Sequence, residues 1–348
     1  MKYIEQPQIT DLSKRIGSPP SHYRALIVGV LIIIGLLLVV SLSLTQGAVS
    51  IQRADLWYAL LRQGNPTYQT VVWDLRLPRV VAAMLVGASL GMSGGLLQGM
   101  LRNDLADPFL LGISSGAGLV SVALFTLGMF QSWVPLAAWL GAIATTIVVY
   151  RLARTGGTLS VERLILGGVA VSALLGAVQS FLLLTAEDGR LQAALNWLSG
   201  SLNGRGWREV TMAGPYIIGA LIGGCLLART VNLLNLGDDF AVGLGISLNR
   251  SRYLIGAVAT LLAAGAVSIC GLVGFIGLIV PHAVRLLVGT DYRFVLPLSA
   301  VGGAFILSLA DLAARMGSVE LPVGIITALL GAPLFIWLLH YQSSLREG

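Results

Sequence analysis

The stretch "LLNLGDDFAVGLGISLNRSR", Leu233–Arg252, is a polar interruption between two apolar runs, and it decides the fold class. Before it lies "MAGPYIIGALIGGCLLA" (Met212–Ala228), and after it lies "YLIGAVATLLAAGAVSIC" (Tyr253–Cys270). Each run approaches the ~20 apolar residues with which a helix crosses a hydrocarbon core about 30 Å thick. The stretch between them holds two adjacent acids, Asp238 and Asp239, and is too long for a simple turn. It therefore predicts a structured loop between two membrane-spanning helices.

The composition supports a membrane protein over the whole chain. The 348 residues are 56% hydrophobic and 11% charged, whereas a soluble domain carries roughly 25% charged residues. The net charge of +6 does not indicate nucleic-acid binding, because most arginines lie at the ends of apolar runs, where the positive-inside rule places them. Cys225 and Cys270 lie inside apolar runs, which predicts buried free thiols and excludes a disulfide framework or a zinc spacing.

The chain has no phosphate-binding loop of its own. Its lysines, Lys2 and Lys14, do not follow the pattern G-x-x-x-x-G-K-[ST] of nucleotide-binding loops. If ATP drives this protein, ATP is expected to bind to another chain. We likewise expect no cofactor and no metal site here.

Ten apolar segments predict an all-α integral membrane protein with both termini on one side. Residues 254–289 are apolar almost without interruption, and we divide them at "CGLVGFIG" (Cys270–Gly277), where glycines permit a tight reversal. The chain then consists of a tail (1–23), a ten-helix domain (24–341) and a second tail (342–348). The predicted segments are Arg24–Gln46, Val80–Leu101, Leu110–Met129, Val134–Leu152, Leu164–Thr185, Thr211–Ala228, Tyr253–Cys270, Gly274–Val288, Pro297–Met316 and Pro322–Tyr341.

The basic residues predict that both termini are cytoplasmic. Most of the 22 lysines and arginines then fall on the inner side, together with the loop Leu233–Arg252. Arg76 and Arg79 in "WDLRLPR" and Arg315 in "LADLAARMG" fall on the outer side, which suggests an acidic partner there. The alternatives are contacts of Arg76 and Arg79 with lipid headgroups, and for Arg315 a pair with Asp311 one helical turn away.

The loop between the sixth and seventh segments has the pattern of two short helical turns. Leu236, Phe240 and Leu244 recur at four-residue spacing, which predicts a short amphipathic helix that ends near Gly245. The following "ISLNRSR" (Ile246–Arg252) can form a second turn. A helix that rests on lipid headgroups is usually rich in lysine and arginine. Because this one is acidic, the pattern favours a protein partner.

One motif has an enzymatic alternative. Ser114 in "LGISSGAG" completes a G-x-S-x-G pattern, and a serine hydrolase would need His282 or His340 beside it. A nucleophile elbow lies between a strand and a helix, whereas this motif begins an apolar helix. Small residues at a close helix contact are the favoured interpretation, as they are for "GASLGMSGG" (Gly87–Gly95), whose glycines recur at four-residue spacing.

Taken together, five motifs resemble the permease subunits of bacterial ABC importers for iron–siderophores, haem and cobalamin. They run in the expected order from the second to the tenth segment, while the first 50 residues and the outer loop 186–208 match only loosely. The motifs are "RLPR" (Arg76–Arg79), "NDLADPFLLGISSGAG" (Asn103–Gly118), "GFIGLIVPHAVRLLVGTDYR" (Gly274–Arg293), "LADLAAR" (Leu309–Arg315) and "ELPVGIITALLGAPLFIWLL" (Glu320–Leu339).

The resemblance implies a non-enzymatic transport subunit in the inner membrane. It would pair with a second permease subunit, identical or different, and with two cytoplasmic ATPases that bind the ATP and magnesium. A substrate-binding protein outside would place glutamates on Arg76, Arg79 and Arg315.

The resemblance also implies a role for the opening stretch as the loop that docks into the ATPase. The residues of this coupling loop are Leu236, Asp238, Asp239, Phe240, Leu244, Gly245, Ser247 and Arg250. The inner gates of the family correspond to Asn103 and Leu105, and to Val161 and Glu162. Glu162 departs from the small polar residue of the cobalamin type.

The expected cargo is a ferric siderophore. "LADP" with Asp107 looks more like the iron members of the family than the "LAEP" of the cobalamin type. Cobalamin and haem import remain alternatives within the family, and an ATP-independent secondary transporter is the alternative outside it.

Overall fold

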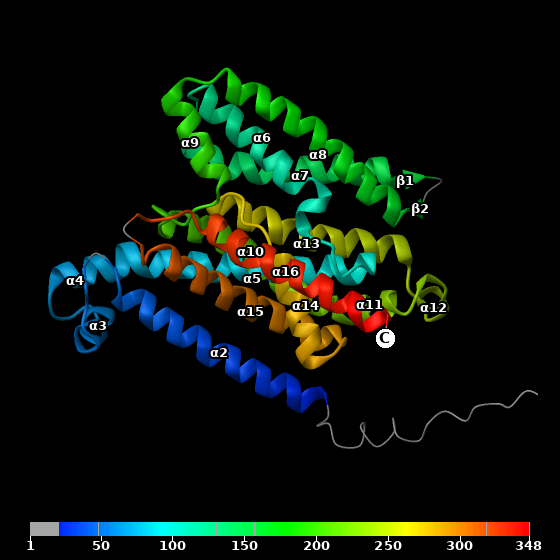
Figure 1. The fold of residues 1–348 in the computed structure, drawn as a ribbon, viewed down its shortest axis with the longest axis horizontal. Helices are drawn as coiled ribbons and strands as arrows, with labels where there is room; N and C mark the ends of the chain where they lie inside the picture. The colour runs from blue at the N-terminus through cyan, green and yellow to red at the C-terminus, as the bar shows by residue number, and fades with distance from the viewer. Residues whose placement is uncertain (1–20, 48, 130, 156–157, 318, 348) are drawn as a thin grey trace, which may run out of the picture.

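The computed structural model describes residues 21–47, 49–129, 131–155, 158–317 and 319–347, and over these ranges the chain is a bundle of helices with one short β-ladder (Figure 1). Most of the predicted tail 1–23 lies outside the described residues. The last helix continues through most of the predicted tail 342–348. The all-α class is therefore confirmed for the described part of the chain.

Each of the ten predicted segments coincides with one helix. Seven helices are long and apolar enough to cross a membrane, and three apolar stretches are shorter: Ile113–Thr126, Ile276–Val288 and Val323–Ile336, the last being the first part of helix α16. The count of ten spans and the side of the termini stay predictions. The ten helices are α2 (Ser21–Thr45), α5 (Leu77–Leu101), α6 (Ile113–Thr126), α7 (Val134–Ala153), α8 (Val161–Leu184), α10 (Trp207–Leu226), α13 (Leu248–Cys270), α14 (Ile276–Val288), α15 (Tyr292–Ala314) and α16 (Val323–Glu347).

Shorter elements join these helices, and the sequence analysis predicted only one of them, α12. A six-residue π-helix, η1, leads directly into α5, so that helical structure is continuous from Pro66 to Leu101. The shorter elements are α3 (Arg53–Leu60), α4 (Pro66–Thr70), η1 (Val71–Arg76), η2 (Pro108–Leu111), η3 (Gln131–Trp133), β1 (Arg154–Thr155), β2 (Thr158–Leu159), α9 (Asp188–Leu198), α11 (Ala228–Asn235) and α12 (Asp238–Gly243).

Helix α5 lies at the centre of the bundle and packs on α15, α13, α14 and α10. Its glycines allow backbones to touch. A Cβ on Gly87 would overlap the carbonyl oxygen of Gly303, and a Cβ on Gly91 would overlap that of Ser299, both on α15. The predicted close packing of this glycine face is confirmed at these two positions. Contact at this distance favours association in lipid, where helix packing replaces the hydrophobic effect between helices.

The predicted division of the long apolar run at Cys270–Gly277 is also confirmed. Helix α13 ends at Cys270, and α14 begins at Ile276. Between them Gly271 adopts φ +75° and Phe275 adopts φ +68°, and such left-handed positions end a helix. A Cβ on Gly271 would overlap the carbonyl oxygen of Trp197, so the reversal requires glycine for space as well as for conformation.

Helices α6, α7 and α8 form a second layer that packs mainly within itself. A Cβ on Gly116 of α6 would lie 2.5 Å from the carbonyl oxygen of Gly141 on α7, so this motif makes a close helix contact. Ser114 lies on α6, whose neighbours are α7, α8, α9, α13 and η2, whereas His282 lies on α14, which packs on α5, α15, α2 and α16. This arrangement gives no support to a serine hydrolase built from these two residues. The side chain of His340 lies outside the described residues.

Candidate functional site

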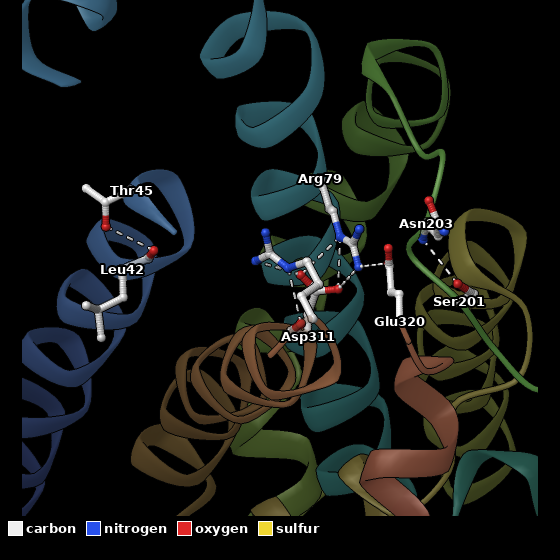
Figure 2. Close-up of polar contacts among 8 residues, drawn as sticks. Leu42, Thr45, Arg79, Ser201, Asn203, Asp311 and Glu320 are labelled. Carbon is white, nitrogen blue, oxygen red and sulfur yellow. Dashed lines mark hydrogen bonds and ion pairs between the residues drawn. The ribbon is translucent and has the colours of Figure 1, made fainter. Parts of the chain in front are cut away.

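A buried carboxylate joins two of the predicted outer arginines. We call Arg79, Asp311, Arg315 and Glu320 the Asp311 cluster; Figure 2 shows that it lies where α5 begins and α15 ends. Asp311 is 1% exposed. It accepts hydrogen bonds from Nε and Nη2 of Arg79 at 3.0 and 2.8 Å, and its other oxygen lies 3.1 Å from Nη2 of Arg315. Glu320, whose side chain is 32% exposed, pairs with Arg79 at 2.6 Å.

The third outer arginine, Arg76, lies in the interior. It is 6% exposed, and its Nη1 donates to the carbonyl oxygen of Leu44 at 2.6 Å. Its Nη2 donates to the carbonyl oxygen of Val49. Arg76 therefore satisfies one carbonyl group in the last turn of α2, where carbonyl groups lack partners within the helix, and one in the segment that follows. The alternative for Arg76 and Arg79 was contact with lipid headgroups. In the described part of the chain, both guanidinium groups instead bind protein groups.

A second polar cluster lies at the opposite end of α5. We call Arg102, Asp238 and Arg252 the Asp238 cluster. Asp238, the first residue of α12, pairs with Arg102 just after α5, and with Arg252 in the first two turns of α13 at 2.8 Å. Arg252 also donates to the carbonyl oxygen of Leu159 at 3.0 Å, in the segment that leads into α8. One carboxylate therefore connects α12 to the loops after α5 and before α8.

The loop that follows α5 is held from its other side as well. Arg285 of α14 pairs with Asp104 at 3.0 Å and donates to the side-chain oxygen of Gln98 at 2.7 Å. The amide nitrogen of Gln98 in turn donates to the carbonyl oxygen of Ala106 at 3.2 Å. The loop is therefore fixed to both α5 and α14.

The residues of the predicted gates lie at the ends of these held segments. Asn103 accepts a hydrogen bond from the backbone N–H of Leu105 at 2.9 Å, and Leu105 is 47% exposed. Val161 is the first residue of α8, and Glu162 is exposed in its first turn. A hollow of about 750 Å³ is lined by Val161 and Glu162 together with the Asp238 cluster. Asn103 and Leu105 do not line it.

Asp107, in the same loop, has a local structural role. Its carboxylate accepts a hydrogen bond from the backbone N–H of Phe109 at 2.8 Å and so caps η2. Loss of surrounding water raises the pKa of this carboxyl to about 6, and the hydrogen bond from Phe109 acts in the opposite direction. The side chain that suggested an iron chelate therefore shapes a turn.

The predicted amphipathic helix exists only in part: α12 carries Phe240, whereas Leu236 ends the preceding helix α11 and Leu244 follows α12. Leu236, Phe240 and Leu244 are 60%, 70% and 60% exposed. Gly245, at φ +83°, follows α12 and ends the turn. Of the two acids, Asp239 is exposed and has no ion pair among the described residues, whereas Asp238 is occupied by its two arginines.

The predicted second turn was wrong as a separate element. Helix α13 begins at Leu248, so most of the stretch Ile246–Arg252 belongs to the first turns of the long helix. Ser247 precedes that helix as its N-cap residue, and Arg250 is exposed in its first turn. A movement of α12 would therefore act directly on a membrane-spanning helix.

Comparisons with known proteins agree with this architecture. The FecCD transport family matches residues 34–341. The cobalamin import system permease protein BtuC of Halobacterium salinarum is 42% identical, with 94% of this chain and 92% of that protein covered. The hemin transport system permease protein HmuU of Yersinia pestis is 38% identical, over 93% of this chain and 98% of its own length. A solved metal-chelate type ABC transporter in an inward-facing conformation superposes with a TM-score of 0.82 at 30% identity, covering 90% and 98% of the two chains.

The fold and these relatives define a multi-pass permease of the plasma membrane, the inner membrane in a cell that has two. The chain belongs to the FecCD family and is an ABC importer permease of the group that serves iron chelates, haem and cobalamin. Sequence reasoning missed Arg102, Arg252 and Arg285 as the residues that fix the loops. The only signal for them was their position at the ends of apolar segments.

Proposed function

We propose that this chain is one of two permease subunits in an importer that moves a ferric siderophore into the cytoplasm. Two separate ATPase subunits bind ATP and magnesium, and a binding protein outside delivers the cargo. In this proposal the chain has ten spans and both termini in the cytoplasm. The observation that carries it is the Asp238 cluster, which joins an exposed apolar turn to the two loops at the predicted gates.

The exposed turn is suited to hold an ATPase. Leu236, Phe240 and Leu244 lie outside the apolar spans, where exposed apolar side chains are unfavourable unless a partner covers them. When the ATPase pair closes, it moves α12. The pairs of Asp238 pass this displacement to Arg102 and Arg252, and hence to the loops that carry Asn103 and Glu162.

Docking of the binding protein uses the Asp311 cluster. Its two guanidinium groups and two carboxylates are neutral together, and the guanidinium of Arg76, which interacts with Arg315, adds a positive charge beside them. Glu320 is the most exposed member of the cluster, so a glutamate of the binding protein can replace it on Arg79. Guanidinium donates two parallel hydrogen bonds to a carboxylate, and this geometry also fixes the orientation of the partner.

The docking proposal has a sharp test in Glu320→Gln. This change frees Arg79 without removing a positive charge, so the binding protein is expected to associate faster at low salt. Arg79→Glu should weaken docking, and a Glu→Arg change in the binding protein should restore part of it. Surface plasmon resonance on the permease–ATPase complex measures both. Equal association rates for the wild type and both variants would contradict docking at this site.

The cargo is tested by transport itself. The complex, reconstituted in liposomes with its binding protein, should import a ferric siderophore in preference to haem and cobalamin. Cobalamin is the second candidate, because the relative at 42% identity is a cobalamin permease and because Asp107 only caps a turn. The purified chain alone should hydrolyse no ATP, and hydrolysis should begin when the ATPase is added. Preferential uptake of cobalamin would overturn the siderophore assignment.

A further inference from the structure

A groove lies between α7 and α13, and none of its lining residues belongs to the two polar clusters. It encloses about 470 Å³, and its lining comes from these two helices and from Arg154 just beyond α7. One part of the lining is aliphatic, with Ile143 and Ile147 on α7 and Ala257 and Leu261 on α13. Both helices are long and apolar enough to cross a membrane, so this part of the groove lies at the depth of the hydrocarbon.

One end of the same groove is cationic. Arg151, in the last turn of α7, and Arg154, which follows it, both line the groove and are exposed. Among the described residues neither has an ion pair with a carboxylate. The rings of Tyr150 and Tyr253 lie beside them with centroids 5.7 Å apart, and tyrosine favours the level of the lipid headgroups.

Two buried hydroxyl groups also line the groove without a partner. Tyr150 is 8% exposed and Thr260 is 5% exposed, and neither hydroxyl has a hydrogen bond within the described part of the chain. Gly256 makes room for the Tyr150 hydroxyl, since a Cβ there would overlap it. A buried hydroxyl without a partner is unfavourable, so the wall of the groove holds two unsatisfied polar groups.

We propose that this groove is a binding site for one anionic phospholipid. The phosphate lies between Arg151 and Arg154, the ester oxygens lie at the level of the tyrosyl rings, and one acyl chain occupies the aliphatic part. Charge complementarity selects the lipid, because two unpaired arginines at a membrane surface attract an anionic headgroup over a zwitterionic one. The groove shares no lining residue with the Asp238 cluster or the Asp311 cluster, although Arg154 pairs with Leu159 in the β-ladder next to Arg252. Lipid binding there is argued without the transport proposal.

Native mass spectrometry of the full chain in neutral detergent tests the proposal, with phosphatidylglycerol and phosphatidylcholine of equal chain length as probes. Wild type should retain one phosphatidylglycerol in preference to phosphatidylcholine. Arg151→Gln with Arg154→Gln should weaken that preference by about 30-fold, since each juxtamembrane arginine contributes about fivefold. The matched control is Arg163→Gln with Arg229→Gln, which removes the same charge from two exposed arginines outside the groove.

A variant that fills the groove and a competition with inorganic phosphate distinguish lipid binding in the groove from simple charge attraction. Ala257→Phe, which fills the aliphatic part without changing charge, should also abolish retention, and inorganic phosphate should not compete. If the control pair lowers the preference as much as the groove pair, the effect is general surface charge and the site is wrong. The site is equally wrong if phosphate displaces the lipid, or if Ala257→Phe retains it.

Discussion

Asp311 is a buried carboxylate that pairs with two arginines. It is 1% exposed and contacts the guanidinium groups of Arg79 and Arg315, and Glu320 supplies the second negative charge of the cluster. We predict that Asp311→Asn destabilises the protein by about 3–5 kcal/mol, because removing one member of a buried pair leaves charge without compensation. Thermal unfolding in detergent measures this. Glu320→Gln is the control and should cost at most about 1 kcal/mol, as exposed pairs do; equal melting temperatures for the two variants would contradict the assignment.

Asp238 and Asp239 form a natural pair of variants for the coupling role. Asp238 pairs with Arg102 and Arg252, whereas its neighbour has no ion pair among the described residues. In the reconstituted complex, Asp238→Asn should still hydrolyse ATP, but the amount of cargo moved per ATP should fall about tenfold. This factor corresponds to about 1.4 kcal/mol, the combined contribution expected of two partly exposed ion pairs. Asp239→Asn breaks none of these pairs and should leave the amount of cargo moved per ATP unchanged. Coupling that is unchanged in Asp238→Asn would remove this residue from the mechanism.

At the scale of elements, the contact between α5 and α15 depends on glycine. We predict that Gly87→Ala lowers stability by about 1–3 kcal/mol, because its Cβ would overlap the carbonyl oxygen of Gly303 and overpacking costs this much. Gly219→Ala on α10 is the matched control. No atom lies within 4 Å of a Cβ at Gly219, so the change should stabilise the helix by up to about 1 kcal/mol. Melting temperatures that rise for both variants would disprove the close contact.

Apolar length predicted the long elements well, since ten apolar segments correspond to ten helices. Even the break between α13 and α14 could be located, because glycines mark the residues that must leave helical geometry. The start of α13 was placed five residues late, at Tyr253 rather than Leu248. The polar residues Asn249–Arg252 resemble a loop in sequence, yet they continue α13, where Arg252 pairs with Asp238 and donates to the carbonyl oxygen of Leu159.

Sequence patterns could not predict contacts between distant residues. Arg102 meets Asp238 across 136 positions, and Arg79 meets Asp311 across 232. Nothing periodic connects such pairs, so only the folded bundle reveals them. The bonds of Arg76 were missed for the same reason, because the carbonyl groups that hold it belong to another element, α2, and to the segment after it.

For the whole molecule, the predicted orientation can be tested by thiol labelling. We predict that single cysteines at Ser247 and Ser343 resist an impermeant reagent in intact cells, while one at Asn203 reacts once any outer membrane is permeabilised. The background lacks Cys225 and Cys270, of which only Cys225 is exposed. The positive-inside distribution of arginines is the physical reason. Labelling of Ser343→Cys from outside would place the carboxyl terminus on the other side and reverse the assignment of both clusters.

The glycine face of α5 has a consequence for how proteins of this kind can diverge. At Gly87 and Gly91 only a hydrogen atom fits between the two backbones, so any side chain would overlap a carbonyl oxygen. Even alanine, the smallest possible step toward a larger residue, is unfavourable there. Changes in cargo specificity are therefore expected at other positions, such as Leu166, Leu174 and Phe181 of α8, whose side chains are exposed in the single chain. The contact between α5 and α15 at the centre of the bundle is therefore expected to change less between related proteins than the surface does.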